Sequence, residues 1–513
     1  MQKLLPLLSL ILLLGIKNNV SGQNIAPVAQ PVAIDSAERV KKIMNTIDIC
    51  TKAIDSKSQD NAMLSSTYAI RGTGYLSLKE YNKAISDYTT AMALNPMLLE
   101  GYYRKAIAYE GLKDYQSAIK QYEMLLSYNK DNQRATASIY NSIAWLQLQL
   151  KQYDKAIKSD SIALSLQPSM NEAYVTRGRV YLAKGKNELA ILDFTTAMGG
   201  YENKKKPLSM LYAGRADAEV KLKKYKEALN DYSAALKLEP DYKYAIWNRA
   251  GCYNMNGDYQ LAADDYNTAI KFYNGDNKNL SKLYDDRARM EIGMQQYQKA
   301  ISDDSVAISL NNKYAPAYWD QAGAYAQNAD FQLSINGYEA CMDFYKSDKT
   351  ITALIYSNIA NEEYFLKEYP KVIHASNAAI AFDSKSWEAY FNRGRAYLKT
   401  QDKDDAMADF DKVLKLDTTK KSSEYAFVLF YMGKPDAAID IMQKNVIATT
   451  DSYLLLNHYY NLACLYSLMN KPDEANSYLK KCVDGGYSKK YAIADSDLDN
   501  IRNTDEFKAM INK

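Results

Sequence analysis

The sequence is short of the residues on which metal, redox and turn-rich proteins depend. Its 513 residues include 2 His, 5 Cys, 11 Pro and 21 Gly. So few glycines and prolines disfavour a turn-rich β protein. His374 and His458 each stand alone, without a neighbouring pattern of metal ligands. The cysteines have neither metal-type spacing nor the number that a disulfide framework would need, although a Cys464–Cys482 bridge stays open as an alternative. We therefore expect no metal and no cofactor.

An excess of one charge and the common catalytic motifs are also missing. The 64 basic residues nearly balance the 61 acidic ones, so the chain lacks the basic footprint of a nucleic-acid-binding protein. It contains no glycine-rich phosphate loop, no His-Glu-x-x-His zinc motif and no nucleophile elbow. These absences predict a protein that is not an enzyme and does not bind nucleic acid.

Long apolar runs are missing too, except for a short one near the beginning. Lys3 precedes an apolar stretch over residues 4–16. That stretch is too short to span a bilayer, which takes a helix of about 20 residues. The short basic start, the apolar stretch and the small residues at 20–22 predict a signal peptide over 1–22, with an uncleaved interfacial anchor as the alternative. An exported protein, periplasmic or secreted and without a transmembrane segment, is the resulting expectation.

What the sequence has in plenty is tyrosine, 45 residues in all, at regular spacing. A frame over residues 65–98 places large residues at positions 4, 11, 17 and 24 and small ones at positions 8, 20 and 27. In this first frame they are Tyr68, Gly72, Tyr75, Tyr81, Ala84, Tyr88 and Ala91, followed by Pro96 at position 32. The spacing puts positions 4, 8 and 11 on one face of a first helix and positions 17, 20, 24 and 27 on one face of a second helix. Proline at position 32 ends the second helix.

This pattern resembles the tetratricopeptide repeat. The resemblance implies an all-α, right-handed superhelical solenoid of antiparallel helix pairs, with about twelve repeats in this chain. The frame recurs at residues 99, 137, 171, 209, 243, 281, 315, 353 and 387. Alternate starts, at 65, 137, 209, 281 and 353, are equally spaced, so the unit is a pair of repeats with four extra residues, present five times.

The repeat predicts the organisation of the whole chain. Repeat arrays need caps, because an end repeat would otherwise expose its apolar face. The expected parts are a signal peptide over 1–22, a flexible lead over 23–34, an N-terminal helical cap over 35–64, ten repeats over 65–420, two degenerate repeats over 421–489 and a C-terminal capping helix over 490–513.

Two features of the repeat leave alternatives open. The four extra residues, for example Lys205–Leu208, would lengthen a helix by about one turn or widen a loop into polar protrusions. We expect the aspartates at position 23, such as Asp87 and Asp231, to face the arginines of position 7. The pairs form either ion pairs between the two helices of a repeat or a charged binding ladder, and the first is favoured.

The resemblance also implies where ligands bind. Tetratricopeptide arrays hold ligands in a concave groove lined by positions 2, 5, 6 and 9 of the first helices. By that resemblance, the groove carries aromatic rings beside amide side chains, which suit an extended peptide. The candidate binding residues are Tyr103, Asn141, Trp145, Trp247, Asn248, Trp319, Asn358, Phe391 and Asn392. The predicted function is a non-enzymatic scaffold or adaptor that acts outside the cytoplasm and binds other proteins in this groove. The alternative is a carbohydrate or small-ligand binder that uses the same aromatic rings.

Overall fold

The computed structural model of the chain describes residues 37–129, 132–449 and 452–512, which fold into α-helices joined by short turns. No strand occurs in these ranges. The prediction of an all-α fold of paired helices is confirmed. The expected segments 1–22 and 23–34 lie outside the described residues. None of the described helices combines the length and the hydrophobicity that a membrane span requires.

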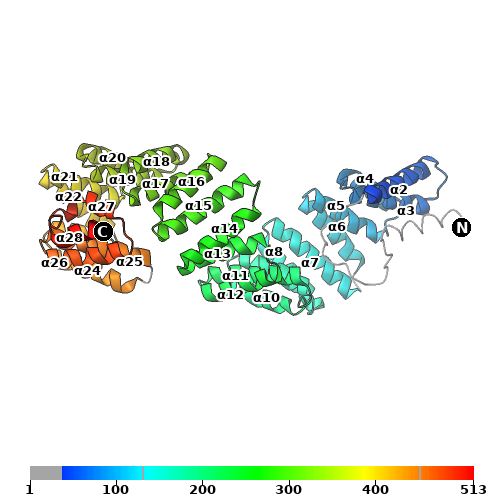
Figure 1. Cartoon of the computed structure of the whole chain (residues 1–513). Helices are drawn as coiled ribbons and strands as arrows, with labels where there is room; N and C mark the ends of the chain where they lie inside the picture. Colours follow the sequence, from blue (N-terminus) through cyan, green and yellow to red (C-terminus); the bar gives the residue numbers. More distant parts are fainter. Residues whose placement is uncertain (1–36, 130–131, 450–451, 513) are drawn as a thin grey trace. The chain divides into compact units, whose positions relative to one another are not determined.

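The chain divides into two compact units, residues 1–240 and residues 241–513. In the first unit, α2 (Ala37–Asp55) precedes five antiparallel helix pairs (Figure 1). The pairs are α3 (Asn61–Ser77) with α4 (Tyr81–Leu94), α5 (Leu99–Gly111) with α6 (Tyr115–Tyr128), α7 (Gln133–Gln149) with α8 (Tyr153–Leu166), α9 (Asn171–Ala183) with α10 (Asn187–Met198), and α11 (Lys205–Lys221) with α12 (Tyr225–Leu238).

The second unit contains seven further pairs and a terminal segment. The pairs are α13 (Lys243–Asn256) with α14 (Tyr259–Phe272), α15 (Asn277–Gly293) with α16 (Tyr297–Leu310), α17 (Ala315–Gln327) with α18 (Phe331–Tyr345), α19 (Lys349–Phe365) with α20 (Tyr369–Phe382), α21 (Trp387–Lys399) with α22 (Lys403–Leu416), α23 (Ser423–Tyr431) with α24 (Pro435–Ala448), and α25 (Ser452–Leu468) with α26 (Pro472–Asp484). Short helices α27 (Lys489–Ala494), η1 (Ser496–Leu498) and α28 (Asp505–Ile511) follow.

Small residues bring the two helices of each pair together. The alanines at position 20 of the frame, such as Ala84 and Ala406, are completely buried. At position 8, a Cβ added to Gly394 would come within 2.7 Å of the ring of Phe410, so only glycine leaves room for that ring. Within each unit, repetition of this contact builds a core between successive pairs, because each helix face is buried against the next.

The four extra residues lengthen helices rather than loops. Helices α3, α7, α11, α15 and α19 each have 17 residues. Of the alternating first helices, α5, α9, α17 and α21 have 13 residues and α13 has 14. An aspartate or asparagine side chain caps four of the five long helices, at Asp60, Asn132, Asp276 and Asp348, by accepting a hydrogen bond from the backbone of the first turn. The extra residues therefore form the first turn of a helix and do not form polar protrusions.

A left-handed residue connects the two helices of every repeat in the 65–420 array. Position 15 has positive φ throughout, in Lys79, Lys113, Lys151, Gly185, Lys223, Gly257, Gln295, Ala329, Lys367 and Gln401. In the first repeat, the backbone N–H of Glu80 donates to the carbonyl of Tyr75 at 2.9 Å and that of Lys79 to Leu76 at 3.0 Å. This is the Schellman arrangement that satisfies the last carbonyls of a helix. The sequence shows its conformational requirement only where the residue is glycine.

The arginines of position 7 form ion pairs with the aspartates of position 23. In Arg393, Nε and Nη2 donate to the two carboxylate oxygens of Asp409 at 2.8 and 2.7 Å. The same two-point contact joins Arg71–Asp87, Arg177–Asp193, Arg215–Asp231, Arg249–Asp265 and Arg287–Asp303. Each pair links the first and second helix of one repeat, which confirms the favoured interpretation over a binding ladder.

The terminal segment after α26 turns back over earlier repeats of the second unit. Gln295, in the turn between α15 and α16, donates through Nε2 to the carbonyl of Gly485 at 3.0 Å. The ring of Tyr491 lies 4.7 Å from the ring of Phe365 and 5.8 Å from that of Phe331. Residues 485–502 therefore contact parts of the second unit as far back in the chain as the turn between α15 and α16.

Candidate functional site

The predicted groove residues all lie on first helices, but in two different units. Tyr103, Asn141 and Trp145 belong to α5 and α7 of the first unit. The other six belong to the second unit: Trp247 and Asn248 on α13, Trp319 on α17, Asn358 on α19, and Phe391 and Asn392 on α21.

Three of the predicted amides make hydrogen bonds within the protein. Asn141, only 6% exposed, donates to Asp160 Oδ1 at 2.9 Å and to Thr176 Oγ1 at 3.1 Å. Asn392, 5% exposed, donates to the carbonyl of Ser357 at 2.9 Å. Asn248 donates to the carbonyl one turn earlier on its own helix. The buried Asn141 and Asn392 amides hold neighbouring first helices together.

The predicted aromatic rings differ in their exposure to solvent. Trp145 is 38% exposed, with Arg179 over its ring at 5.7 Å. Trp247 is half-buried, donates through Nε1 to Asp286 at 2.9 Å and meets Tyr273 edge-on. Trp319 and Tyr103 also meet tyrosines edge-on, Tyr338 and Tyr122 respectively. Trp145 is the most exposed of these four rings.

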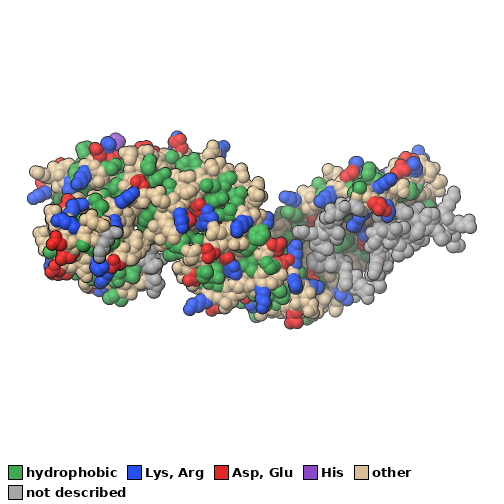
Figure 2. All heavy atoms as spheres, in the orientation of Figure 1, with side chains coloured by type: hydrophobic (Ala, Val, Ile, Leu, Met, Phe, Trp, Pro, Cys, Tyr) green, Lys and Arg blue, Asp and Glu red, His purple; other side chains and the backbone are tan. Residues whose placement is uncertain are grey.

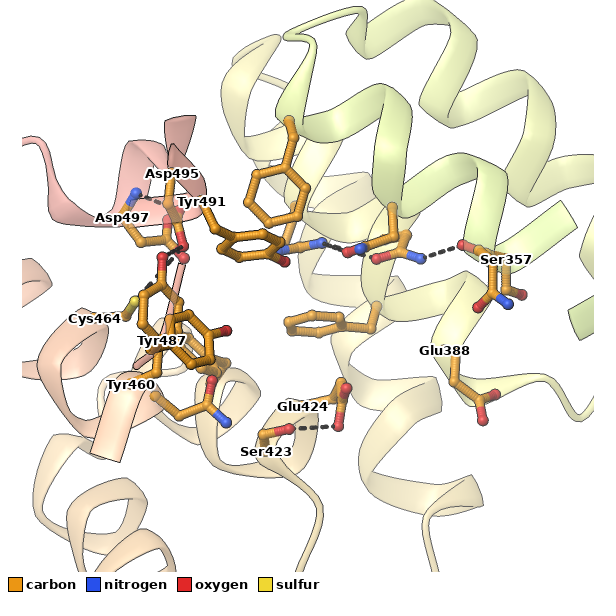
Figure 3. A pocket seen from close by; sticks show the side chains of 18 residues that line it. Ser357, Glu388, Ser423, Glu424, Tyr460, Cys464, Tyr487, Tyr491, Asp495 and Asp497 are labelled. Atoms are coloured by element: carbon orange, nitrogen blue, oxygen red, sulfur yellow. Dashed lines mark hydrogen bonds between the residues drawn. The ribbon is translucent and has the colours of Figure 1, made fainter. Parts of the chain in front are cut away.

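Three of the predicted residues, Asn358, Phe391 and Asn392, come together at one cavity of about 290 Å³ in the second unit. Its walls are α19, α21, α23 and α25, the first helices of four consecutive repeats, together with the terminal segment. Figure 3 shows Ser357 and Glu388 on the right, Ser423 and Glu424 below, and Tyr460, Tyr487, Tyr491, Asp495 and Asp497 on the left.

Arg395 is the cation of this cavity. The residue is 8% exposed, and Nη2 donates to Asn361 Oδ1 at 3.0 Å and to Asn392 Oδ1 at 2.9 Å. Its guanidinium lies 4.1 Å from the ring centre of Tyr364 and 4.6 Å from that of Phe391. Such stacking favours a buried guanidinium. Amides and rings therefore fix Arg395 in place, while its Nε has no hydrogen-bond partner among the described residues.

The terminal segment supplies aromatic rings and two carboxylates to the cavity. Tyr460 of α25 stacks on Tyr487 at 4.6 Å, and its hydroxyl donates to Asp495 Oδ2 at 2.8 Å. Asp495 also accepts from the backbone N–H of Asp497 at 2.9 Å. Burial, and next the charge of Asp495, raise the pKa of Asp497 to about 7. Asp497 is 5% exposed, and its Oδ1 has no hydrogen-bond partner in the part of the chain that the structure describes.

The opposite wall carries two glutamates without a cation. Ser423 donates to Glu424 at 3.0 Å, and Ser386 donates to Glu388 at 3.4 Å. Burial raises the pKa of Glu388, and the charge of Glu424 raises it further. Within the described ranges, neither glutamate forms an ion pair. Sequence reasoning missed Glu388 and Arg395, although they occupy groove positions 2 and 9 of the frame that begins at Trp387.

A second acidic cluster lies earlier in the same unit, on α15, α16 and α17. Arg289 contacts Asp320 at 2.5 Å, Asp286 at 2.9 Å and also Asp285. Asp304 on α16 is completely buried, and neither of its carboxylate oxygens has a partner among the described residues. Burial raises the pKa of Asp304 to about 10, with smaller contributions from Asp285 and Asp320. No described group of His, Cys, Asp and Glu has the arrangement of a metal site.

Comparisons with known proteins show which repeat family the sequence resembles. Models of the tetratricopeptide repeat match residues 99–132, 137–169, 214–277, 387–420 and 458–484. These matches fall in both units and include helices that line the cavity. The chain contains tetratricopeptide repeats.

Among curated relatives of this repeat protein is the mitochondrial import receptor subunit TOM70 of Homo sapiens, 23% identical over 61% of the chain and 52% of the relative. The human DnaJ homolog subfamily C member 7 is 20% identical over 70% of the chain and 68% of the relative. The chain spans about half the length of the first curated relatives it matches. A solved tetratricopeptide repeat protein from Parabacteroides merdae is 18% identical over 53% of the chain and 99% of that protein, with a TM-score of 0.39.

Two expectations from the sequence need correction. The prediction of an exported, periplasmic or secreted protein is wrong: the relatives are named as a mitochondrial import receptor subunit and as DnaJ homologues. The short apolar stretch over residues 4–16 is a weak signal, because such runs also occur without export. The alternative of a Cys464–Cys482 bridge is also wrong, since both thiols are free and buried.

Proposed function

We propose that the protein is a non-enzymatic interaction scaffold that binds a segment of a partner polypeptide along the first helices of the second unit. The observation that carries the proposal is the cavity shared by α19, α21, α23 and α25. An extended polypeptide that crosses these four helices would contact a new repeat every few residues. Its affinity would come from several small contacts on a surface that is already formed.

Other features of the described residues support binding rather than chemistry. The side chains of the cavity are amides, aromatic rings, carboxylates and one arginine that is fixed by its neighbours. On the face drawn in Figure 2, basic and acidic side chains are interspersed, so no large field of one sign selects nucleic acid. One relative is named a mitochondrial import receptor subunit, and a receptor works by binding, which supports the same class of function here. The division of the chain into caps and repeats at residues 65, 421 and 490 remains part of this proposal.

Site-specific photo-crosslinking tests the proposal. A small diazirine amino acid replaces Asn358 or Asn461, which line the cavity, in the full chain. The matched controls carry it at Leu261 or Leu333, which are 48% and 47% exposed on second helices. We expect polypeptide adducts from the first two positions and few from the controls. Equal yields from all four positions would contradict the proposal.

A further inference from the structure

The cavity of the second unit has an imbalance of charge that its own residues do not neutralise. Four carboxylates line it, Glu388, Glu424, Asp495 and Asp497, against one cation, Arg395. Arg395 stands between rings and donates to two amides, and within the described ranges it makes no direct ion pair with any of the four. Carboxylates in a partly enclosed site favour a positive partner, because the low dielectric strengthens the attraction.

A buried acceptor without a donor also indicates a partner that donates a hydrogen bond. Asp497 is only 5% exposed, and its Oδ1 accepts no hydrogen bond from any described residue. A buried polar atom without a partner is costly, and a native protein rarely keeps one without a reason. The wall of the terminal segment therefore also offers an acceptor to a donor from outside the chain.

Aromatic rings complete the chemistry of the site. Phe391 and Phe427 line the cavity. Tyr460, Tyr487 and Tyr491 line it on the side of the terminal segment (Figure 3). Cations bind over the faces of aromatic rings, most strongly where water is excluded. Rings and carboxylates together select a cation, whereas an anion would meet carboxyl groups on both walls and a single opposite charge.

We infer that this cavity receives the side chain of a lysine or arginine from an extended partner polypeptide. Glu388 and Glu424 bind the charged group, and the rings hold its aliphatic stem. A volume of about 290 Å³ holds one such side chain with a few water molecules, but not a folded domain. The inference rests on the proposed function, since it names the chemistry of the partner at the same site.

The test uses two peptide libraries on the immobilised full-length protein. One is acetyl-Xaa-Xaa-Lys-Xaa-Xaa-amide, with uncharged residues at Xaa, and the other has norleucine in place of lysine. Norleucine keeps the aliphatic stem and removes the charge, and the blocked ends carry none. Mass spectrometry of the retained peptides gives the enrichment of lysine over norleucine, which we expect to be at least tenfold.

A matched pair of variants locates the effect. Glu388→Gln with Glu424→Gln removes two charges from the cavity, and the enrichment should fall below threefold. Glu339→Gln with Glu368→Gln removes the same charge from exposed positions outside the cavity, and the enrichment should not change. Equal loss in both double variants would overturn the inference, because it would reveal only a general effect of net charge.

Two further outcomes would also overturn it. Equal retention of both libraries would show that the site does not select a cation. If free n-butylammonium bound as tightly as the lysine peptides, the occupant would be a small amine and not a polypeptide side chain. In either case, adducts from Asn358 and Asn461 would leave the scaffold proposal standing, whereas their absence would remove the scaffold proposal itself.

Discussion

Asp304 gives the sharpest electrostatic prediction of the structure. It is completely buried on α16, its two carboxylate oxygens lack partners among the described residues, and its pKa is raised to about 10. The groups around it are Asp285, Asp303 and Asp320, which raise the pKa, and Arg289, which lowers it. Asp304 therefore stays protonated in the folded protein at neutral pH and is ionised in the unfolded chain.

The sign of the effect follows from proton linkage. The folded state binds one more proton than the unfolded state between the two pKa values, so stability falls as pH rises through that range. Each pH unit costs about 1.4 kcal/mol for one such proton. The window from pH 6 to pH 8 lies well inside the range from an ordinary aspartate pKa to about 10. Over this window Asp304 should remove about 3 kcal/mol of stability.

The variant Asp304→Asn removes the proton and its pH dependence. Relative to the unchanged protein, its stability should increase by about 3 kcal/mol more at pH 8 than at pH 6. The comparison at two pH values cancels any fixed cost of burying the amide. Because repeat arrays open locally, native-state hydrogen exchange of α16 and α17 is the suitable assay. Taking ratios between variant and unchanged protein removes the intrinsic pH dependence of exchange.

A matched control is Asp411→Asn, at an exposed aspartate on α22. Its relative stability should vary by less than about 0.5 kcal/mol over the same window, as expected for a surface substitution. If Asp304→Asn and Asp411→Asn behaved alike, Asp304 would be ionised in the folded protein, and its described burial would not determine its charge.

Two further predictions concern the repeat itself. Arg393→Ala leaves Asp409, which is 4% exposed, without the arginine that contacts both of its carboxylate oxygens. Hydrogen exchange should show that the local stability of α21 and α22 falls by about 2–4 kcal/mol. A loss below about 0.5 kcal/mol, the size of a surface effect, would mean that the Arg–Asp pairs do not hold the repeats together. Lys151→Gly, at φ +57° in the turn between α7 and α8, should stabilise that repeat by about 0.5–1 kcal/mol, because glycine adopts this conformation without strain. Lys155→Gly, inside α8, should instead destabilise the repeat by about 1 kcal/mol, and the turn interpretation fails if the two changes have the same sign.

Much of the fold could be predicted from spacing alone. The regular period of the paired repeats, the helix pairs and the Arg–Asp contacts follow from recurring residue types whose positions fix which helix faces meet. The left-handed turn residue could not be found, because lysine occupies it more often than glycine does and only the backbone shows the conformation. Whether the four extra residues lengthen a helix or a loop could not be predicted either, since a helical turn and a polar loop accept the same side chains.

The candidate site could be predicted only in part. Groove positions in the frame led to Asn358, Phe391 and Asn392, which reach one cavity. The groove positions could not show that the Asn392 side chain is already hydrogen-bonded to Ser357 and Arg395, because these bonds depend on packing between first helices. Nor could they reveal Tyr491, Asp495 and Asp497, which come from a terminal segment outside the repeat pattern. Contacts between residues so far apart in the sequence have no local signal.

The central claim, that the first helices of the second unit bind a polypeptide, is tested most directly by hydrogen exchange of the full chain with the retained lysine peptides. We predict slower exchange in α19, α21, α23 and α25, where the cavity lies, and unchanged exchange in α14, α16 and α18. Protection of those second helices, with none in the helices of the cavity, would contradict it.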